Sequence, residues 1–180
     1  MIAINNTKLL NKILYNELLT QSELPKKRVL NAINNYGVDL QKQISPLVFE
    51  SIDKTDCVVL FQLFGRSSTN NKSMTEDDGS ITYYKSYELK LILYGNDGTD
   101  YANKIAARFR TENCRNNLLL QGVYLEEITY PETINEFING SMWIRNDVSI
   151  YIGCKFTFEQ INNINKFEEI SNLKIINKEE

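Results

Sequence analysis

The stretch SMWIRNDVSIYIGCKFTF, Ser141 to Phe158, alternates between apolar and polar side chains over most of its length. The polar face carries Asp147 and every second residue after it. The apolar face carries Val148, Ile150, Ile152, Cys154, Phe156 and Phe158. A period of two residues is typical of an antiparallel strand that is buried on one face. The pattern therefore predicts a half-buried strand with Trp143 and Arg145 at its entrance.

A segment earlier in the chain is predicted to be the helix that covers this strand. The turn GNDGT at residues 95–99 opens a run in which apolar residues recur at helical spacing. One side of the expected helix carries Tyr101, Ala102, Ile105, Ala106 and Phe109, whereas Lys104, Arg108 and Arg110 face away. We expect the side with Ile105 and Phe109 to pack on the apolar face of the strand.

Further segments are predicted to be strands of the same sheet. CVVLFQLFG ends at Gly65 and ITYYKSYELKLILYG begins at Ile81, and both are rich in β-branched and aromatic residues. We expect these two to pair as an extended hairpin across residues 66–80, a polar stretch predicted to be an exposed and mobile loop. VYLEEITY at residues 123–130 is a shorter strand, followed by a turn and a loop over residues 131–140.

The N-terminal part is predicted to be helical. A first amphipathic helix, with Thr7 near its cap, has one apolar stripe made of Leu9, Leu10, Ile13, Leu14 and Leu18. A second helix is predicted over PKKRVLNAINNYG, because Pro25 suits a first helical turn and Gly37 suits a C-terminal stop. Both helices are expected at the surface.

These elements predict an α+β fold. About four strands form an antiparallel sheet that packs against a central helix and leaves its other face open to a neighbour. A chain of 180 residues favours a single domain, which we place at residues 1–160 with a helical N-terminal part at residues 1–50. Residues 161–180 mix apolar residues with Asn and charge, and are expected to form a C-terminal extension.

The composition argues against several classes of function. The formal charge of -3 is unlike that of a general nucleic-acid binder, which usually presents a basic surface to phosphate. The absence of histidine excludes Ser-His and Cys-His nucleophiles and His-ligated metals. Cys57, Cys114 and Cys154 are odd in number and far apart, which argues against a disulfide framework or a CxxC metal site. The glycines form no GxGxxG or Walker pattern, so no cofactor is expected.

The first residues, MIAINNTKLLNKILYNELL, interrupt their apolar positions with Asn and Lys. The run is therefore unlike a signal peptide, and it is too short and too polar for a membrane span. We expect the chain to stay in the cytosol or to leave it within an assembly.

A family resemblance rests on DYANKIAARFR at residues 100–110 and on the run from residue 118 to residue 156. The family shows a helix with small and apolar residues, a strand led by Gly, a loop, and an aromatic residue two positions before Arg. The matching residues here are Ala102, Ile105, Ala106, Gly122, Val123, Trp143, Arg145 and the alternating run Val148–Phe158. In these features residues 58–158 resemble the tail-terminator-like neck proteins of bacteriophages.

The resemblance implies a ring-forming structural subunit, typically in a hexamer, that caps the tail tube and joins it to the head connector. Its expected partners are other copies of itself, the tail-tube protein on one side and the head-connector or stopper protein on the other, with the tail sheath added if the tail is contractile. DNA would only pass through the lumen of the ring, and no membrane is involved. The expected location is the neck of the virion, and the host cytoplasm during assembly.

Interface residues are expected mainly in the long polar loop and at the entrance of the last strand. They are Arg66, Asn70, Lys72, Asp77, Arg108, Trp143 and Arg145. The loop is longer than a hairpin needs, which is usual for a functional connection. Trp143 is interpreted either as a core aromatic or as an interface anchor, and Arg145 either as a solvated or intrachain-paired charge or as an interface contact.

Two other functions remain open at this point. Another head-tail connector or a tail-completion protein could have the same kind of fold. A nuclease or hydrolase that depends on carboxylates would need Glu88, Glu126 and Glu127 to converge on a divalent cation, although no spacing in the sequence demands it.

Overall fold

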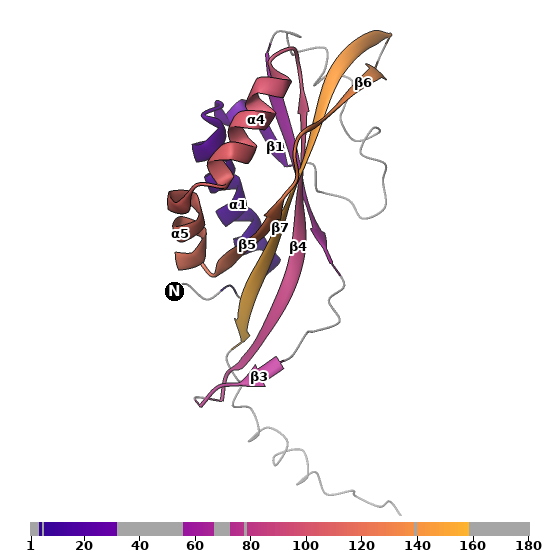
Figure 1. Cartoon of the computed structure of the whole chain (residues 1–180). Helices are drawn as coiled ribbons and strands as arrows, with labels where there is room; N and C mark the ends of the chain where they lie inside the picture. Colours follow the sequence, from indigo (N-terminus) through magenta and orange to yellow (C-terminus); the bar gives the residue numbers. More distant parts are fainter. Residues whose placement is uncertain are drawn as a thin grey trace, which may run out of the picture.

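The computed structural model describes residue 4 and residues 6–31, 56–66, 73–77, 79–138 and 140–158 of the chain. Within this part, a sheet of seven strands carries its helices on one face (Figure 1). The predicted α+β class is confirmed. The predicted sheet of about four antiparallel strands is wrong in detail, because one strand pair is parallel and three short strands join the four that were expected.

Two long antiparallel strands form the centre of the sheet. β4 (Ile81–Tyr94) pairs along its whole length with β7 (Ser141–Phe158). On the other side of β4 lies β2 (Val58–Gly65), so the predicted hairpin between these two strands is confirmed. β1 (Val29–Asn31) runs parallel to β2 and forms one edge of the described sheet.

The opposite edge of the sheet is built by two strands in succession. β5 (Val123–Ile128) pairs with the C-terminal half of β7, and β6 (Glu132–Ile138) pairs with its N-terminal part. The loop predicted through Asn135 is therefore wrong, because residues 132–138 form a regular hairpin with β7. The turn between them contains Gly140 at φ 75°, a conformation that glycine adopts without steric cost.

The cap of the first helix, α1 (Thr7–Ser22), lies one residue before the predicted cap Thr7. Asn6 is its N-cap, and the Asn6 Oδ1 accepts a hydrogen bond of 2.8 Å from the backbone N–H of Leu9. The expectation of a surface helix is wrong for α1, because its apolar stripe lies in the main core. The buried residues of that stripe are Leu10, Ile13, Leu14 and Leu18.

The second predicted helix is wrong where the structure describes it. Lys26–Arg28 form a single 3₁₀ turn, and the chain then enters β1. Val29 and Leu30 gain more as a strand, because they pair with β2 and the Val29 side chain is buried in the main core. The rest of the predicted helix, residues 32–37, lies outside the described residues.

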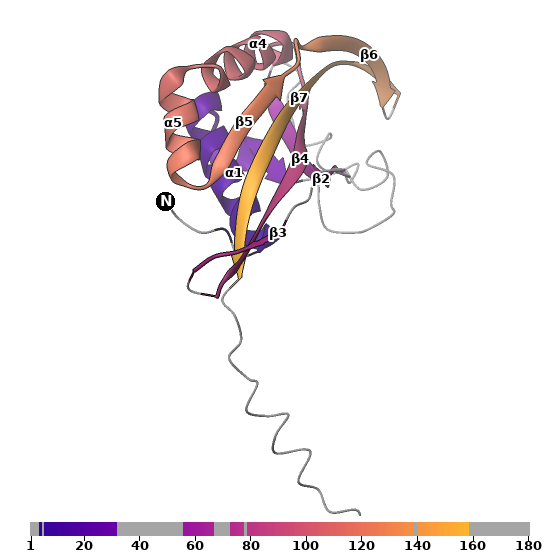
Figure 2. The ribbon, with the colours of Figure 1, turned by 60° about the horizontal axis from the view of Figure 1, so that its bottom comes forward.

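The helix predicted to cover the sheet is confirmed as α4 (Gly98–Phe109), whose buried side carries Ala102, Ile105, Ala106 and Phe109. A further helix, α5 (Glu112–Leu120), follows it and was not predicted. Thr111 caps α5, since its Oγ1 accepts from the backbone N–H of Cys114. Together with α1, these helices cover one face of the sheet (Figure 2).

The core confirms the predicted alternation of β7. Every second residue from Val148 to Phe156 is buried in the cluster that α1, α4 and α5 close. Phe158, expected on the same face, is 41% exposed and stacks on Tyr83.

Gly95, between β4 and α4, has φ 118°, and a Cβ there would lie 2.0 Å from the backbone oxygen of Asp56. Only glycine therefore fits this connection.

The predicted loop over residues 66–80 is partly ordered as a strand. β3 (Ser73–Thr75) pairs antiparallel with the start of β4, and a tight turn follows it, in which Gly79 donates a backbone hydrogen bond to the carbonyl of Glu76. Residues 67–72 lie outside the described residues. The side chains of β3 are exposed, so backbone pairing and not burial holds this strand in place.

Candidate functional site

The feature that distinguishes this fold from a plain sandwich is a two-stranded arm. We define the arm as β6 together with the residues of β7 that pair with it, residues 141–147. β4 ends at Tyr94, which lies opposite Arg145, so among the described strands only β6 pairs with the outer residues of β7. Figure 1 shows the arm extending beyond the rest of the sheet, away from the helices.

An ionic cluster fixes the base of the arm. The Arg145 guanidinium donates two hydrogen bonds of 2.7 Å to the two carboxylate oxygens of Asp147, and its Nη1 lies 3.5 Å from Glu136 on β6. The Tyr94 hydroxyl donates a 2.7 Å hydrogen bond to the same Glu136 carboxylate. A two-pronged guanidinium–carboxylate contact is strong and directional. The cluster therefore joins β6 of the arm to β7 and to the end of β4.

Two members of the cluster, Tyr94 and Arg145, have raised pKa values. Burial, and secondly the Glu136 carboxylate, raise the pKa of Tyr94 above its ordinary value. The Asp147 carboxylate raises the pKa of Arg145 further. Tyr94 and Arg145 therefore keep their protons throughout the physiological range.

Trp143 lies on the sheet face that the helices do not cover. It is 5% exposed and packs in a small apolar cluster with Val58, Leu60, Ile92 and Tyr94. The partly buried Leu30 and Ile138 pack against the same cluster. Trp143 therefore belongs to a second, minor core, as the core interpretation expects, and it attaches the arm to β2 and β4.

Asn146 ties the arm to the helical layer. Its side chain is fully buried, and its Oδ1 accepts hydrogen bonds from Thr99 at the start of α4 and from Thr133 on β6, at 3.1 and 2.7 Å. A Cβ on Gly98 would lie 3.0 Å from the Asn146 Nδ2, so this helix start must be small. Sequence reasoning missed Asn146, because it lies just before the alternating run and its partners come from distant segments.

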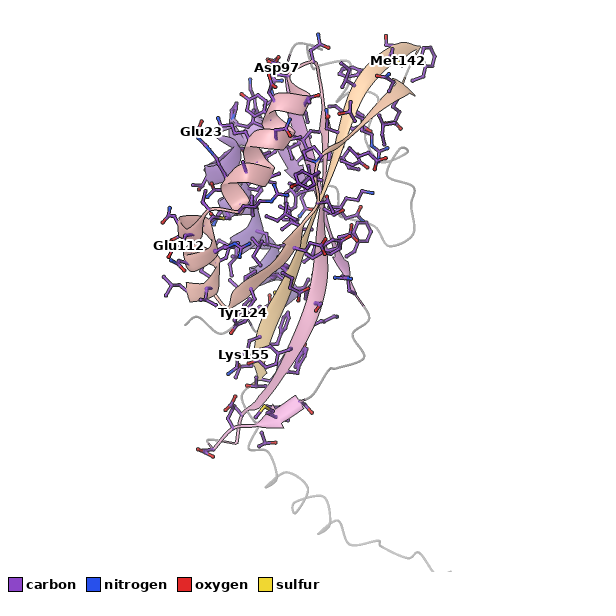
Figure 3. All side chains as sticks on the ribbon, in the orientation of Figure 1. Glu23, Asp97, Glu112, Tyr124, Met142 and Lys155 are labelled. Atoms are coloured by element: carbon purple, nitrogen blue, oxygen red, sulfur yellow. The ribbon has the colours of Figure 1, made fainter. Side chains whose placement is uncertain are left out.

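The outer part of the arm exposes apolar side chains. Phe137 and Met142 face each other across the two strands and are 69% and 57% exposed. Figure 3 shows Met142 at the far end of the arm. Ile134 is also exposed, at 37%. Clustered apolar side chains of this size on a projecting element are typical of a surface that meets another chain.

A groove lies at the other edge of the sheet, between α1 and β1. Its volume is about 840 Å³. Its apolar lining comes from Leu9, Tyr15, Val29, Leu30 and Phe61, and its polar lining from Asn6, Lys8, Asn11, Lys12, Lys26 and Asn31. No acidic residue is among these lining residues, so the groove is apolar inside and positively charged at its rim.

The predicted interface residues fall in several places. Arg66 is exposed, pairs with Glu126 at 3.8 Å and lies over the Tyr151 ring, so it spans the uncovered face of the sheet. Asp77 is exposed in the turn after β3. Arg108 donates to the Gln21 carbonyl and pairs with Glu23, which joins α4 to the end of α1.

The structure does not bring these predicted residues together in one place. Arg145 and Trp143 lie at the base and the inner side of the arm, as described above. Asn70 and Lys72 lie outside the described residues. Sequence reasoning missed Phe137 and Met142, and the signal for them was an apolar residue two or three positions on each side of Gly140, which was predicted to lie in a loop.

Two of the three carboxylates considered for a metal-dependent enzyme have other partners. Glu88 accepts a 2.7 Å hydrogen bond from the Ser149 hydroxyl, and Glu126 accepts one of 3.2 Å from Ser86. Glu127 is exposed. Within the described ranges, no group of three or more His, Cys, Asp or Glu side chains is placed to hold a metal ion.

The cysteines are buried and unpaired. Burial raises the pKa of the Cys57 and Cys154 thiols to about 12, and it raises the pKa of Cys114 as well. A thiol that stays protonated at neutral pH is a poor nucleophile. These cysteines therefore act as small apolar core residues.

The fold and the arm define an α+β structural subunit with an exposed apolar surface on a projecting hairpin. The family model described as phage neck terminator protein matches residues 49–179, well over half of the chain, so the chain belongs to this family. The matched range includes the arm and extends through the predicted C-terminal extension. The chain is therefore a structural protein of the phage neck, located in the tail and neck region of the virion.

Two further observations concern curated relatives and membrane spans. A search of curated proteins finds no match. None of the helices in the described part of the chain combines the length and the hydropathy that a membrane span requires.

Proposed function

We propose that this chain is the tail-terminator subunit that forms a closed ring, with six copies as the expected number, at the end of the tail tube. The ring stops polymerisation of the tube and joins it to the head connector. The observation that carries the proposal is the match to the neck terminator family over residues 49–179. The arm supports the proposal, because Phe137 and Met142 are exposed and can be buried only by contact with a partner.

The ring acts through its surfaces. One face of the ring binds the tail-tube protein and the other binds the head-connector or stopper protein, and in a contractile tail the sheath binds as well. DNA passes through the lumen. A ring of identical subunits needs only head-to-tail contacts whose rotation closes.

The turn after β3 supplies a second contact in this proposal. β3 and its turn stand at the opposite end of the sheet from the arm, and Asp77 is exposed there. We propose that this loop, residues 66–80, touches a neighbouring subunit or ring. Replacing it by a tight turn is expected to preserve folding, because the β3 side chains are exposed, and to impair assembly. Normal assembly of the shortened chain contradicts this contact.

The proposal is tested by the mass of the full chain in solution. Native mass spectrometry is performed on the purified protein alone and with tail-tube subunits. A discrete closed oligomer is expected in at least one of the two samples. A strictly monomeric chain in both samples contradicts the terminator function.

A further inference from the structure

We propose that the arm of one subunit docks into the groove between α1 and β1 of the next copy of the same chain. The inference rests on the proposed ring and deepens it, since it names the contact that joins the subunits. The anchor is the exposed pair Phe137 and Met142, and the receptor is the groove lined by Leu9, Tyr15 and Phe61.

The positions of the two surfaces fit a ring. The arm belongs to the β5–β6 edge of the sheet, whereas the groove includes β1 at the opposite edge. A contact between opposite sides of identical subunits is head-to-tail, so it continues from one subunit to the next until the rotation closes. Within one subunit the anchor lies outside the groove, because neither Phe137 nor Met142 is among the residues that line it. The occupant is therefore a second copy of this chain.

The apolar parts of the two surfaces are complementary. Phe137 and Met142 are adjacent across the arm and form one compact, exposed anchor. The groove, at about 840 Å³, lies within the range of pockets that bury molecules much larger than one side chain. Aromatic residues and Met are enriched among the side chains that anchor interfaces. Docking would bury the arm's most exposed apolar pair in the described groove.

The charges of the two surfaces are opposite. β6 contains Glu132 and Glu136 and no Lys or Arg, and the arm as a whole, with three acidic residues and Arg145 as its one basic residue, has a net charge of -2. The groove has Lys8, Lys12 and Lys26 at its rim, and none of the ion pairs among the described residues involves these lysines. Glu132 is exposed beside the arm's base. Opposite charges at an interface favour the correct partner and orientation.

Cysteine cross-linking tests the contact directly. A Met142→Cys chain is mixed with a Lys12→Cys chain under assembly conditions and treated with a short bis-maleimide. Because the native thiols are buried with raised pKa values, the introduced cysteines react selectively. Covalent dimers are expected in the mixture. The matched control replaces Lys12→Cys by Leu120→Cys, since Leu120 is 66% exposed on α5 and lies outside both surfaces.

The cross-linking outcomes separate the alternatives. Dimers that form equally with Leu120→Cys, or from Met142→Cys alone, contradict docking into the groove, because they indicate random or arm-to-arm contact. A double variant carrying Met142→Cys and Lys12→Cys is expected to give a ladder of multimers. A cross-link within a single chain would instead show that the arm reaches its own groove, which overturns the proposal.

A charge reversal gives an independent test. Lys26→Glu is expected to weaken assembly at least tenfold, whereas Lys27→Glu leaves it unchanged, because Lys27 is the exposed neighbour that does not line the groove. Adding Glu132→Lys to Lys26→Glu is expected to restore part of the assembly. Equal effects of Lys26→Glu and Lys27→Glu contradict the proposal.

The failure of the two proposals can be distinguished. A wild-type chain that stays monomeric alone and with tail-tube subunits overturns both the ring and the docking contact. A wild-type ring that forms normally with Lys26→Glu, and that gives no cross-link between positions 142 and 12, overturns the docking contact only.

Discussion

The two halves of β7 differ in pattern and in surroundings, because buried and partly buried side chains alternate from Val148 to Phe156, whereas Met142, Trp143 and Ile144 follow one another in the outer half. From Val148 to Phe156, each apolar side chain points under the helices and is buried. From Ser141 to Ile144, the strand runs past the end of β4, and the same face carries Met142, which is 57% exposed. The comparison teaches that the sequence pattern predicts where the strand runs, but not which part of it the helices cover. The half from Val148 to Phe156 serves folding, and we propose that the half from Ser141 to Ile144 serves assembly.

The largest expected effect breaks the buried half. Ile152→Ala removes a fully buried side chain from the main core and is expected to lower the free energy of unfolding by about 2–5 kcal/mol. Urea unfolding followed by circular dichroism measures the loss. An unchanged midpoint would show that the inner half of β7 is not the centre of the core.

A smaller loss is expected at the boundary of the two halves. Arg145→Ala removes the cation that contacts both the Asp147 and the Glu136 carboxylates and leaves Asp147 with Lys90 alone, and a cost of about 1–3 kcal/mol is expected for such groups. Thermal melting and ring formation are measured on the same variant. Lys90→Ala is the matched control, because Lys90 lies 3.5 Å from Asp147 but is more exposed, and its expected cost is below about 1 kcal/mol.

The outcome at Arg145 also distinguishes its two interpretations. A clear loss of melting temperature identifies it as an intrachain partner that joins β6 to β7 at the base of the arm. A normal melting temperature with failed assembly would instead identify Arg145 as a direct interface residue.

Alkaline pH probes the main core through the Cys57 and Cys154 thiols, of which Cys154 lies in the buried half of β7. The pKa of Cys57 and Cys154 is raised to about 12 in the folded chain from an ordinary value of 9.0. Because the unfolded chain loses these protons first, the contribution of the thiols is complete below pH 9 and is lost as the pH rises from 9 towards 12. At pH 10 the loss is expected to be roughly 1 kcal/mol per thiol.

Urea unfolding at pH 7 and pH 10 measures this loss. A Cys57→Ala and Cys154→Ala double variant supplies the control, since its stability should fall less between the two pH values than that of the wild type. An equal fall in the two proteins would contradict the burial of the thiols.

Sequence patterns predicted the elements whose structure follows from their own residues, without contacts to distant segments. The alternation of β7 and the helical spacing in α4 gave both elements and their buried faces. The second helix failed, because Pro25 and the following residues fit a helix start in isolation, whereas Val29 and Leu30 pair with β2, a distant segment. α5 was missed because its apolar residues are few, and only Cys114 and Leu118 are buried.

The candidate site was harder to predict for the same reason. Trp143 and Arg145 were noticed, and the structure gives both of them partners within the chain. Phe137 was read as part of a loop, because the polar residues around it hide the short strand β6. Phe137 is exposed on the arm because β4 ends opposite Arg145 and does not pair with the outer part of β7.

The smallest effect on folding and the largest on assembly are expected at the arm. The central measurement compares the native mass and the melting temperature of the wild-type chain with those of Phe137→Ser, with Leu120→Ser as the control for loss of an exposed apolar side chain. We expect the wild type and Leu120→Ser to form the closed ring and Phe137→Ser to remain a subunit, while all three melt at nearly the same temperature. A Phe137→Ser chain that assembles like the wild type, or that loses its fold, would contradict the division of β7 into a folding half and an assembly half.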